Sequence, residues 1–442
     1  MKIQLSDHFT LGKLFRFTLP SIVMMIVTSV YGVVDGLFVS NFVGKTPFAA
    51  VNFIFPVIML LGSFGFLFGT GGSALVSLTM GTGDRKRANR LFSLITYVSV
   101  GVGVVISVLG IIFLRPLAAR LGAEGELLDL CVIYGRILLA GNPFFMLQLQ
   151  FQSFFVTAEK PQLGLVDSLI AGGTNMVLDA LFIAVFDWGI VGAALATALS
   201  HVAGGLFPVI YFSRKNSSIL RLTGCSFDGK ALWKTCTNGS SELLSNLSMS
   251  LVNMLYNVQL MKYAGENGVA AYGVLMYVNM IFIGTFIGYS IGTAPVFGYH
   301  LGAENYGELR SLRRKSLGVI GVFSLVMLSL GQLLAPILSR MFVSYDRELM
   351  EMTLRGFRIF SFSFLFAGVA IFGSGFFTAL NNGPVSAAIS FLRTLVFEMA
   401  AILLLPLIWG VDGIWMSIVV AELMAAVASM IFMYLLRKRY KY

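Results

Sequence analysis

The sequence predicts an all-α integral membrane protein with twelve transmembrane helices in two pseudo-symmetric six-helix lobes. Three observations support this class. Of the 442 residues, 57% are hydrophobic and only 12% are charged, whereas a soluble protein carries about 25% charged residues. Twelve apolar runs are each long enough to cross a bilayer, which takes about 20 residues. Small residues also recur at one constant spacing in the two halves of the chain.

The twelve apolar runs divide evenly between the halves. In the first half they cover residues 17–40, 50–78, 91–114, 128–155, 162–186 and 189–213. In the second half they cover residues 236–263, 269–299, 316–340, 350–378, 384–408 and 411–436. The first run continues too far for the apolar core of a signal peptide, so we interpret it as the first span.

The basic residues between the runs predict how the protein is oriented. Because the number of spans is even, both termini lie on one side of the membrane. The loops on that side hold 21 of the 31 Lys and Arg residues, and the opposite loops hold Lys45, Arg115, Arg120, Lys262, Arg340 and Arg347. An excess of basic residues marks cytoplasmic loops. We therefore expect a multi-pass protein of the cytoplasmic membrane with both termini in the cytoplasm.

The net charge of +10 arises from these basic residues in the cytoplasmic loops. It does not indicate a basic patch on a soluble fold, so we expect no nucleic-acid partner.

An internal repeat with an offset of 221 residues relates the two halves. It pairs Gly81 with Gly302, and it also pairs Gly44 with Gly265, Gly71 with Gly292, Gly189 with Gly410 and Gly192 with Gly413. Because each half has an even number of spans, both insert with the same orientation, as in transporters built from parallel repeats. We predict a first lobe at 1–213, a cytoplasmic linker at 214–235, and a second lobe with a basic tail at 236–442.

Polar side chains inside three spans of the first half form the strongest candidate site. Asp35 lies in the first span with Tyr31 four residues before it, and Asp179 lies in the fifth span with Asn175 four residues before it. Thr197 lies in the sixth span. Residues four apart share a helix face, and ionisable groups within a span are costly and mark function. Two carboxylates with amide and hydroxyl oxygens suit Na⁺, and two close carboxylates also suit H⁺. We expect the coupling cation, Na⁺ or H⁺, to bind at this site. Its residues are Asp35, Asn175, Asp179 and Thr197, with Tyr31 as a hydrogen-bond partner.

The repeat separates this polar set from the scaffold. At the offset of 221 residues, Asp35 corresponds to Tyr256 and Asp179 to Ala400. The glycines therefore repeat, whereas the polar set does not, which favours a site. The alternative is that each acid only forms hydrogen bonds with a neighbouring helix.

Five further residues receive weaker interpretations. Glu242, near the start of the seventh span, is either a second-lobe acid or an interfacial group. Asp167 lies near a span end, where we expect it to be solvated. Arg393 and Glu398 in the eleventh span are expected to neutralise each other. Pro20 interrupts the first span and is a candidate hinge, because proline removes a backbone hydrogen bond.

No motif for catalysis or for a cofactor is found in the sequence. It has no glycine-rich phosphate loop, and its three His and three Cys residues lack metal-ligand spacing. We expect neither an enzyme nor an ATP-driven pump, but a transporter that uses an ion gradient.

Three segments resemble the MATE (multidrug and toxic compound extrusion) family. They are VDGLFVSNFVG in the first span, GTGGSALVSLTMGTGD in the second and GYSIGTAPVFGYHLGAEN in the eighth. The resemblance covers nearly the whole chain, and the DinF- and MepA-like branch is the most similar. Matching site residues are the bending proline, tyrosine and acid of the first helix (Pro20, Tyr31, Asp35) and the cation-site residues of the fifth and sixth helices (Asn175, Asp179, Thr197).

The resemblance implies a V-shaped pair of lobes and export of amphipathic, often cationic, organic compounds in exchange for Na⁺ or H⁺. We also expect a monomer whose partners are small organic molecules and the lipid bilayer. The tenth span carries no acid, which favours coupling in the first lobe. A lipid-linked oligosaccharide flippase of the same superfamily stays open as the alternative function.

Overall fold

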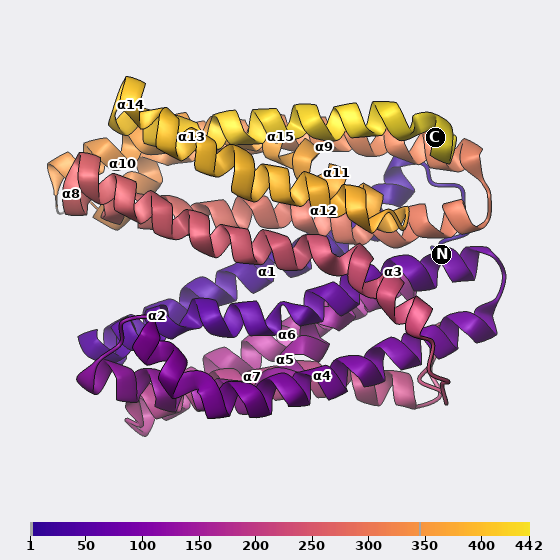
Figure 1. The fold of residues 1–442 in the computed structure, drawn as a ribbon, viewed down its shortest axis with the longest axis horizontal. Helices are drawn as coiled ribbons and strands as arrows, with labels where there is room; N and C mark the ends of the chain where they lie inside the picture. Colours follow the sequence, from indigo (N-terminus) through magenta and orange to yellow (C-terminus); the bar gives the residue numbers. More distant parts are fainter. Residues whose placement is uncertain (1–2, 344–345) are drawn as a thin grey trace.

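The computed structural model describes residues 3–343 and 346–442, and within these residues the protein is built of helices (Figure 1). The first half contains α1 (Leu11–Phe42), α2 (Lys45–Gly62), α3 (Phe64–Gly81), α4 (Arg85–Arg120), α5 (Gly125–Thr157), α6 (Pro161–Asp179), the π-helix η1 (Ala180–Val185) and α7 (Gly189–Ser213). The second half contains α8 (Gly229–Gly302), α9 (Tyr306–Val343), α10 (Arg347–Phe360), the 3₁₀-helix η2 (Ser361–Ser363), α11 (Phe364–Ala379), α12 (Gly383–Phe391), the π-helix η3 (Leu392–Phe397), α13 (Glu398–Leu404), α14 (Pro406–Trp409) and α15 (Val411–Tyr440).

Eleven helical stretches in the described residues are long and apolar enough to cross a membrane. One of them, α8, is long enough to cross it twice. Helix α8 has 74 residues, which at 1.5 Å per residue is about 110 Å, far more than a hydrocarbon core of about 30 Å. Its helix is broken at Gly265, where φ is 63° and ψ is −155°. The described chain therefore has the twelve predicted spans. Helix α8 begins at Gly229, so residues 229–235 of the predicted linker are helical.

The same contact between the halves occurs twice, as the repeat predicts. Gly71 on α3 packs against Gly239 on α8, and Gly292 on α8 packs against Thr18 on α1. Adding 221 to the numbers of Gly71 and Thr18 gives Gly292 and Gly239. A methyl group at Gly71 or Gly292 would overlap the neighbouring helix. Small residues thus allow the close helix approach that is typical of membrane proteins.

Helices of the first half gather in one bundle and α9–α15 in the other, with α8 running along the boundary (Figure 1). Both chain ends lie at the same end of the molecule. There the segment before α1 connects the halves: the amide of Leu5 donates to Glu159 at 2.8 Å, and the amide of Phe9 donates to Glu308 at 2.9 Å. Leu5 and Phe9 are fully buried.

Candidate functional site

Helices α1 and α6 bring two carboxyl groups together inside the first half. The carboxyl of Asp35 on α1 faces both the carboxyl of Asp179 and the amide of Asn175 on α6. Asn175 and Asp179 share one face of α6, as their spacing predicts. Asp179 is fully buried and Asn175 is 7% exposed. Asp35 is partly buried. The three side chains therefore form one polar cluster inside the first half, which we call the Asp35–Asp179 cluster.

Several atoms of this cluster have no hydrogen-bond partner among the described residues. They are both carboxylate oxygens of Asp179, Oδ1 of Asp35 and the amide nitrogen of Asn175. Buried polar atoms are almost always hydrogen-bonded, and an exception calls for an explanation such as a bound ion or water. The open oxygens are hard donors, which suit Na⁺, and the paired carboxyl groups also suit H⁺.

A tyrosine that sequence reasoning missed lies beside this cluster. Tyr134 on α5 is 1% exposed, its hydroxyl faces Thr197 on α7, and it lies within electrostatic range of Asp35 and Asp179. Thr197 itself donates its hydroxyl to the carbonyl of Ala193 at 3.1 Å. Tyr134 has no polar residue at helical spacing that would have singled it out in the sequence, and its place near the cluster depends on tertiary packing.

Tyr31 and Pro20 occupy different parts of α1. The ring of Tyr31 covers Gly172 on α6, where a methyl group would overlap it. Tyr31 therefore lies on the face of α1 that contacts α6, one turn before Asp35. Helix α1 is continuous through Pro20, and the role of Pro20 as a hinge stays a prediction.

The structure corrects the interpretation of Asp167. This residue was expected to be solvated, but it is 1% exposed, and both of its carboxylate oxygens lack a partner among the described residues. Asp167 precedes Asp179 by twelve positions on α6, so it lies inside the first half and not in a loop. Hydropathy placed the start of this span correctly, at residue 162 against Pro161 in the structure. The error was to assume that a residue near a span end faces solvent, because Asp167 instead lies on a buried face of α6.

The second half contains another polar cluster, which is partly buried, and here too the sequence interpretation was wrong. Arg393 does not form its ion pair with Glu398. Its Nη2 and Nε atoms instead donate to the carboxylate of Glu422 on α15 at distances of 2.7 to 3.0 Å. The side chains of Arg393 and Glu422 are 19% and 5% exposed. Glu398 and Glu242 lie nearby within electrostatic range of Arg393.

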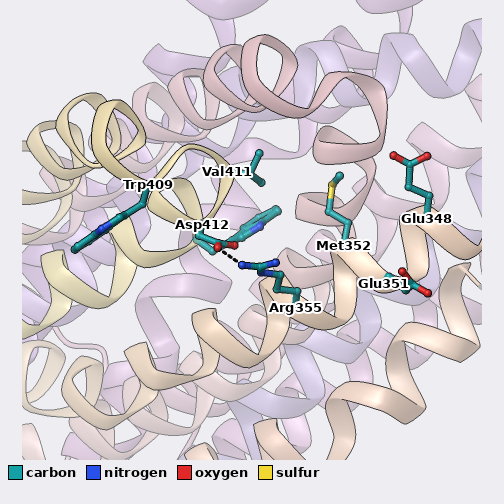
Figure 2. Close-up of a pocket in the computed structure, with 8 residues that line it drawn as sticks. Glu348, Glu351, Met352, Arg355, Trp409, Val411 and Asp412 are labelled. Atoms are coloured by element: carbon teal, nitrogen blue, oxygen red, sulfur yellow. Dashed lines mark hydrogen bonds and ion pairs between the residues drawn. The ribbon is translucent and has the colours of Figure 1, made fainter.

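A cavity of about 380 Å³ opens at the end of the second half that is far from the termini. It is lined by residues of α10, α14 and α15, and the guanidinium of Arg355 reaches the carboxylate of Asp412 there (Figure 2). None of the sequence-predicted site residues line this cavity.

Comparison with known proteins gives consistent matches over nearly the whole chain. The family model MatE matches twice, at residues 20–181 and at residues 243–404. The multidrug export protein MepA of Staphylococcus aureus is 26% identical over 428 residues, which is 96% of this chain and 94% of that protein. Its counterpart in Staphylococcus haemolyticus is 25% identical, over 99% of this chain and 97% of its own length.

Solved structures match equally well. One, described as the outward-facing conformation of a multidrug resistance MATE family transporter of the MOP superfamily, is 25% identical with a TM-score of 0.94. The match covers 100% of this chain and 98% of that one.

Proposed function

Since this chain belongs to the MatE family of transporters, we propose that it exports structurally varied organic compounds in exchange for Na⁺ or H⁺. The export of drugs is supported by the relatives, which are multidrug export proteins. The exchange for a cation is supported by the Asp35–Asp179 cluster, whose buried oxygens lack partners among the described residues. This observation carries the proposal.

In this proposal Asp35 and Asp179 carry the coupling cation. Asn175 and Thr197 supply further oxygens, and Tyr31 and Tyr134 hold hydrogen bonds around them. A cation can drive transport only by binding two conformations of the protein with different affinity. Occupation of the cluster from outside would stabilise one arrangement of α1 against α6, and thereby the conformation that releases the drug.

We further propose that the two halves, divided at the 214–235 linker, act as the two lobes of the transporter, with both termini in the cytoplasm. Both chain ends lie at one end of the molecule, and the loops predicted on that side hold most of the basic residues, which supports the cytoplasmic assignment. Glu242 is not part of the proposed coupling site.

The flippase alternative receives less support from the buried charges. A lipid pyrophosphate would need free cationic side chains in the interior, whereas the partly buried Arg393 is already paired with Glu422 through both Nε and Nη2. We therefore retain drug export as the function.

The experiment that tests the exchange uses the purified protein in liposomes loaded with ethidium, an organic cation. Efflux is followed by fluorescence with a Na⁺ gradient, a pH gradient, or neither. The proposal expects efflux to require one of the two gradients. Equal efflux under all three conditions would contradict coupling, and transport of a lipid-linked sugar in place of ethidium would favour the flippase.

A further inference from the structure

The polar cluster of the second half has more acids than its one arginine can neutralise. Arg393, Glu398, Glu242 and Glu422 come from η3, α13, α8 and α15. Arg393 is committed to Glu422 by a bidentate ion pair, which leaves Glu398 and Glu242 without a paired cation among the described residues. A charge without a partner is expensive in a membrane interior. At least one of these carboxyl groups therefore needs a proton or a cation.

A π-helical turn places the two residues at the centre of this cluster on one face. Arg393 is the second residue of η3, and Glu398 follows its last residue. On a regular α-helix, residues five apart point about 140° away from each other. The wider π turn brings them toward the same side, and such turns are frequent at functional sites. Glu398 is thereby directed at α8 and α15 and away from lipid.

Charged or polar groups from three elements, α15, η3 and α8, face the carboxyl of Glu398. Glu422 on α15 repels its negative charge, Arg393 on η3 attracts it, and the hydroxyl of Tyr256 on α8 points at its carboxyl. Tyr256 is 2% exposed, and its hydroxyl forms no hydrogen bond of regular geometry among the described residues.

Tyr256 is held rigidly in this position. Its ring stacks on that of Tyr272 with centroids 4.9 Å apart, and the hydroxyl of Tyr272 donates to Asn253 at 2.8 Å. Tyr256 is also the repeat counterpart of Asp35. Both halves therefore place a polar group of their first span against a carboxyl group from a later span.

We propose that Glu398 carries an exchangeable proton, which makes the second half a proton-binding site separate from the Asp35–Asp179 cluster. On protonation, a proton (H⁺) from water binds to one carboxylate oxygen of Glu398, which forms an O–H bond and makes the acid neutral. The neutral acid then donates to the hydroxyl oxygen of Tyr256, and the ionised carboxylate accepts from it. The Arg393–Glu422 pair stays ionised throughout. This inference does not depend on which ion binds at Asp35 and Asp179.

The test is infrared difference spectroscopy of the purified protein during a pH jump, which detects the carbonyl band of a neutral carboxylic acid. The measurement is made in an Asp35→Asn/Asp167→Asn/Asp179→Asn background, so that the buried carboxyl groups of the first half contribute nothing. The proposal expects a band that disappears as the pH rises and that loses intensity in Glu398→Gln. Tyr256→Phe should shift the frequency of the band and the pH at which it disappears.

The matched control is Glu266→Gln, which changes an exposed glutamate directly after the break of α8 at Gly265 and should leave the band intact. Glu398→Asp, which keeps a carboxyl group, should retain a band and serves if Glu398→Gln does not fold. A band that persists unchanged in Glu398→Gln, or no neutral-acid band in the background protein, would overturn the proposal. A different measurement tests the proposed first-half coupling site. Unimpaired efflux by the Asp35→Asn/Asp179→Asn protein would contradict that site without affecting the proposal for Glu398.

Discussion

At the scale of single residues, the sequence identified some of the charged groups inside the protein but not their partners. The high cost of an acid in lipid was enough to select Asp35 and Asp179 from the sequence, and helical spacing was enough to add Asn175. The partner of Arg393 could not be predicted in this way. Arg393 and Glu422 are 29 residues apart on different spans, and only tertiary packing brings them together. Tyr134 escaped prediction for the same reason.

Replacing Glu422 by Gln should destabilise the protein strongly. It leaves the partly buried Arg393 without its ion pair, and removal of one partner of a fully buried pair costs up to about 3–5 kcal/mol. The thermal unfolding of the purified protein in detergent measures this change. Glu351→Gln is the matched control, because its ion pair with Arg347 is exposed and surface pairs contribute less than about 1 kcal/mol. Equal unfolding temperatures for the two variants would contradict the importance of the buried pair.

Replacing Tyr134 by Phe should lower transport without lowering stability by much. The change removes only the hydroxyl that faces Thr197 beside the Asp35–Asp179 cluster, and a net hydrogen bond contributes about 1 kcal/mol. Gradient-driven efflux and thermal unfolding, measured on the same preparation, separate the two effects. Wild-type efflux in this variant would remove Tyr134 from the site.

At the scale of helices, hydropathy predicted the number of spans but not where they begin. Several helices extend beyond their apolar runs to polar N-cap residues, whose side chains accept hydrogen bonds from the first turn. Thr10 caps α1, Asp84 caps α4 and Asp228 caps α8. Hydropathy also cannot indicate the π turns η1 and η3, because they depend on how the later residues of a span pack against neighbouring helices.

Replacing Gly71 by Val should weaken the contact between α3 and α8. The added side chain would overlap the backbone of Thr235 and Gly239, and overpacking of this kind costs about 1–3 kcal/mol. Thermal unfolding is again the measurement. Gly101→Val on α4 is the control, because Gly101 is exposed and has no neighbour within 4 Å. If both variants unfold at the wild-type temperature, close packing at Gly71 is not needed.

At the scale of the whole molecule, the repeat was the most informative signal in the sequence. The offset of 221 residues predicted equivalent positions in the two halves, and the contacts of Gly71 and Gly292 are equivalent in the structure. What the repeat could not reveal is the chemistry that differs between the halves. The second half has Tyr256 where the first has Asp35, and its acids come from other spans.

The native cysteines allow the orientation of the molecule to be tested without mutation. Cys225 in the connection between α7 and α8 is exposed, whereas Cys131 is buried and Cys236 is partly buried. We expect a membrane-impermeant maleimide to label Cys225 in inverted vesicles but not in right-side-out vesicles. Cys225→Ser should abolish the labelling. Ready labelling in right-side-out vesicles would place this connection outside the cell and reverse the predicted topology.

The central claim is that Asp35 and Asp179 couple a cation gradient to export. The most direct measurement is ethidium efflux from liposomes that contain wild-type, Asp35→Asn or Asp179→Asn protein, with Na⁺ and pH gradients applied separately. We expect both variants to fold, because Asn keeps the shape of Asp, and to lose gradient-driven efflux. Glu242→Gln should do less harm. Near wild-type efflux by both Asn variants under the gradient that drives the wild-type protein would contradict the claim.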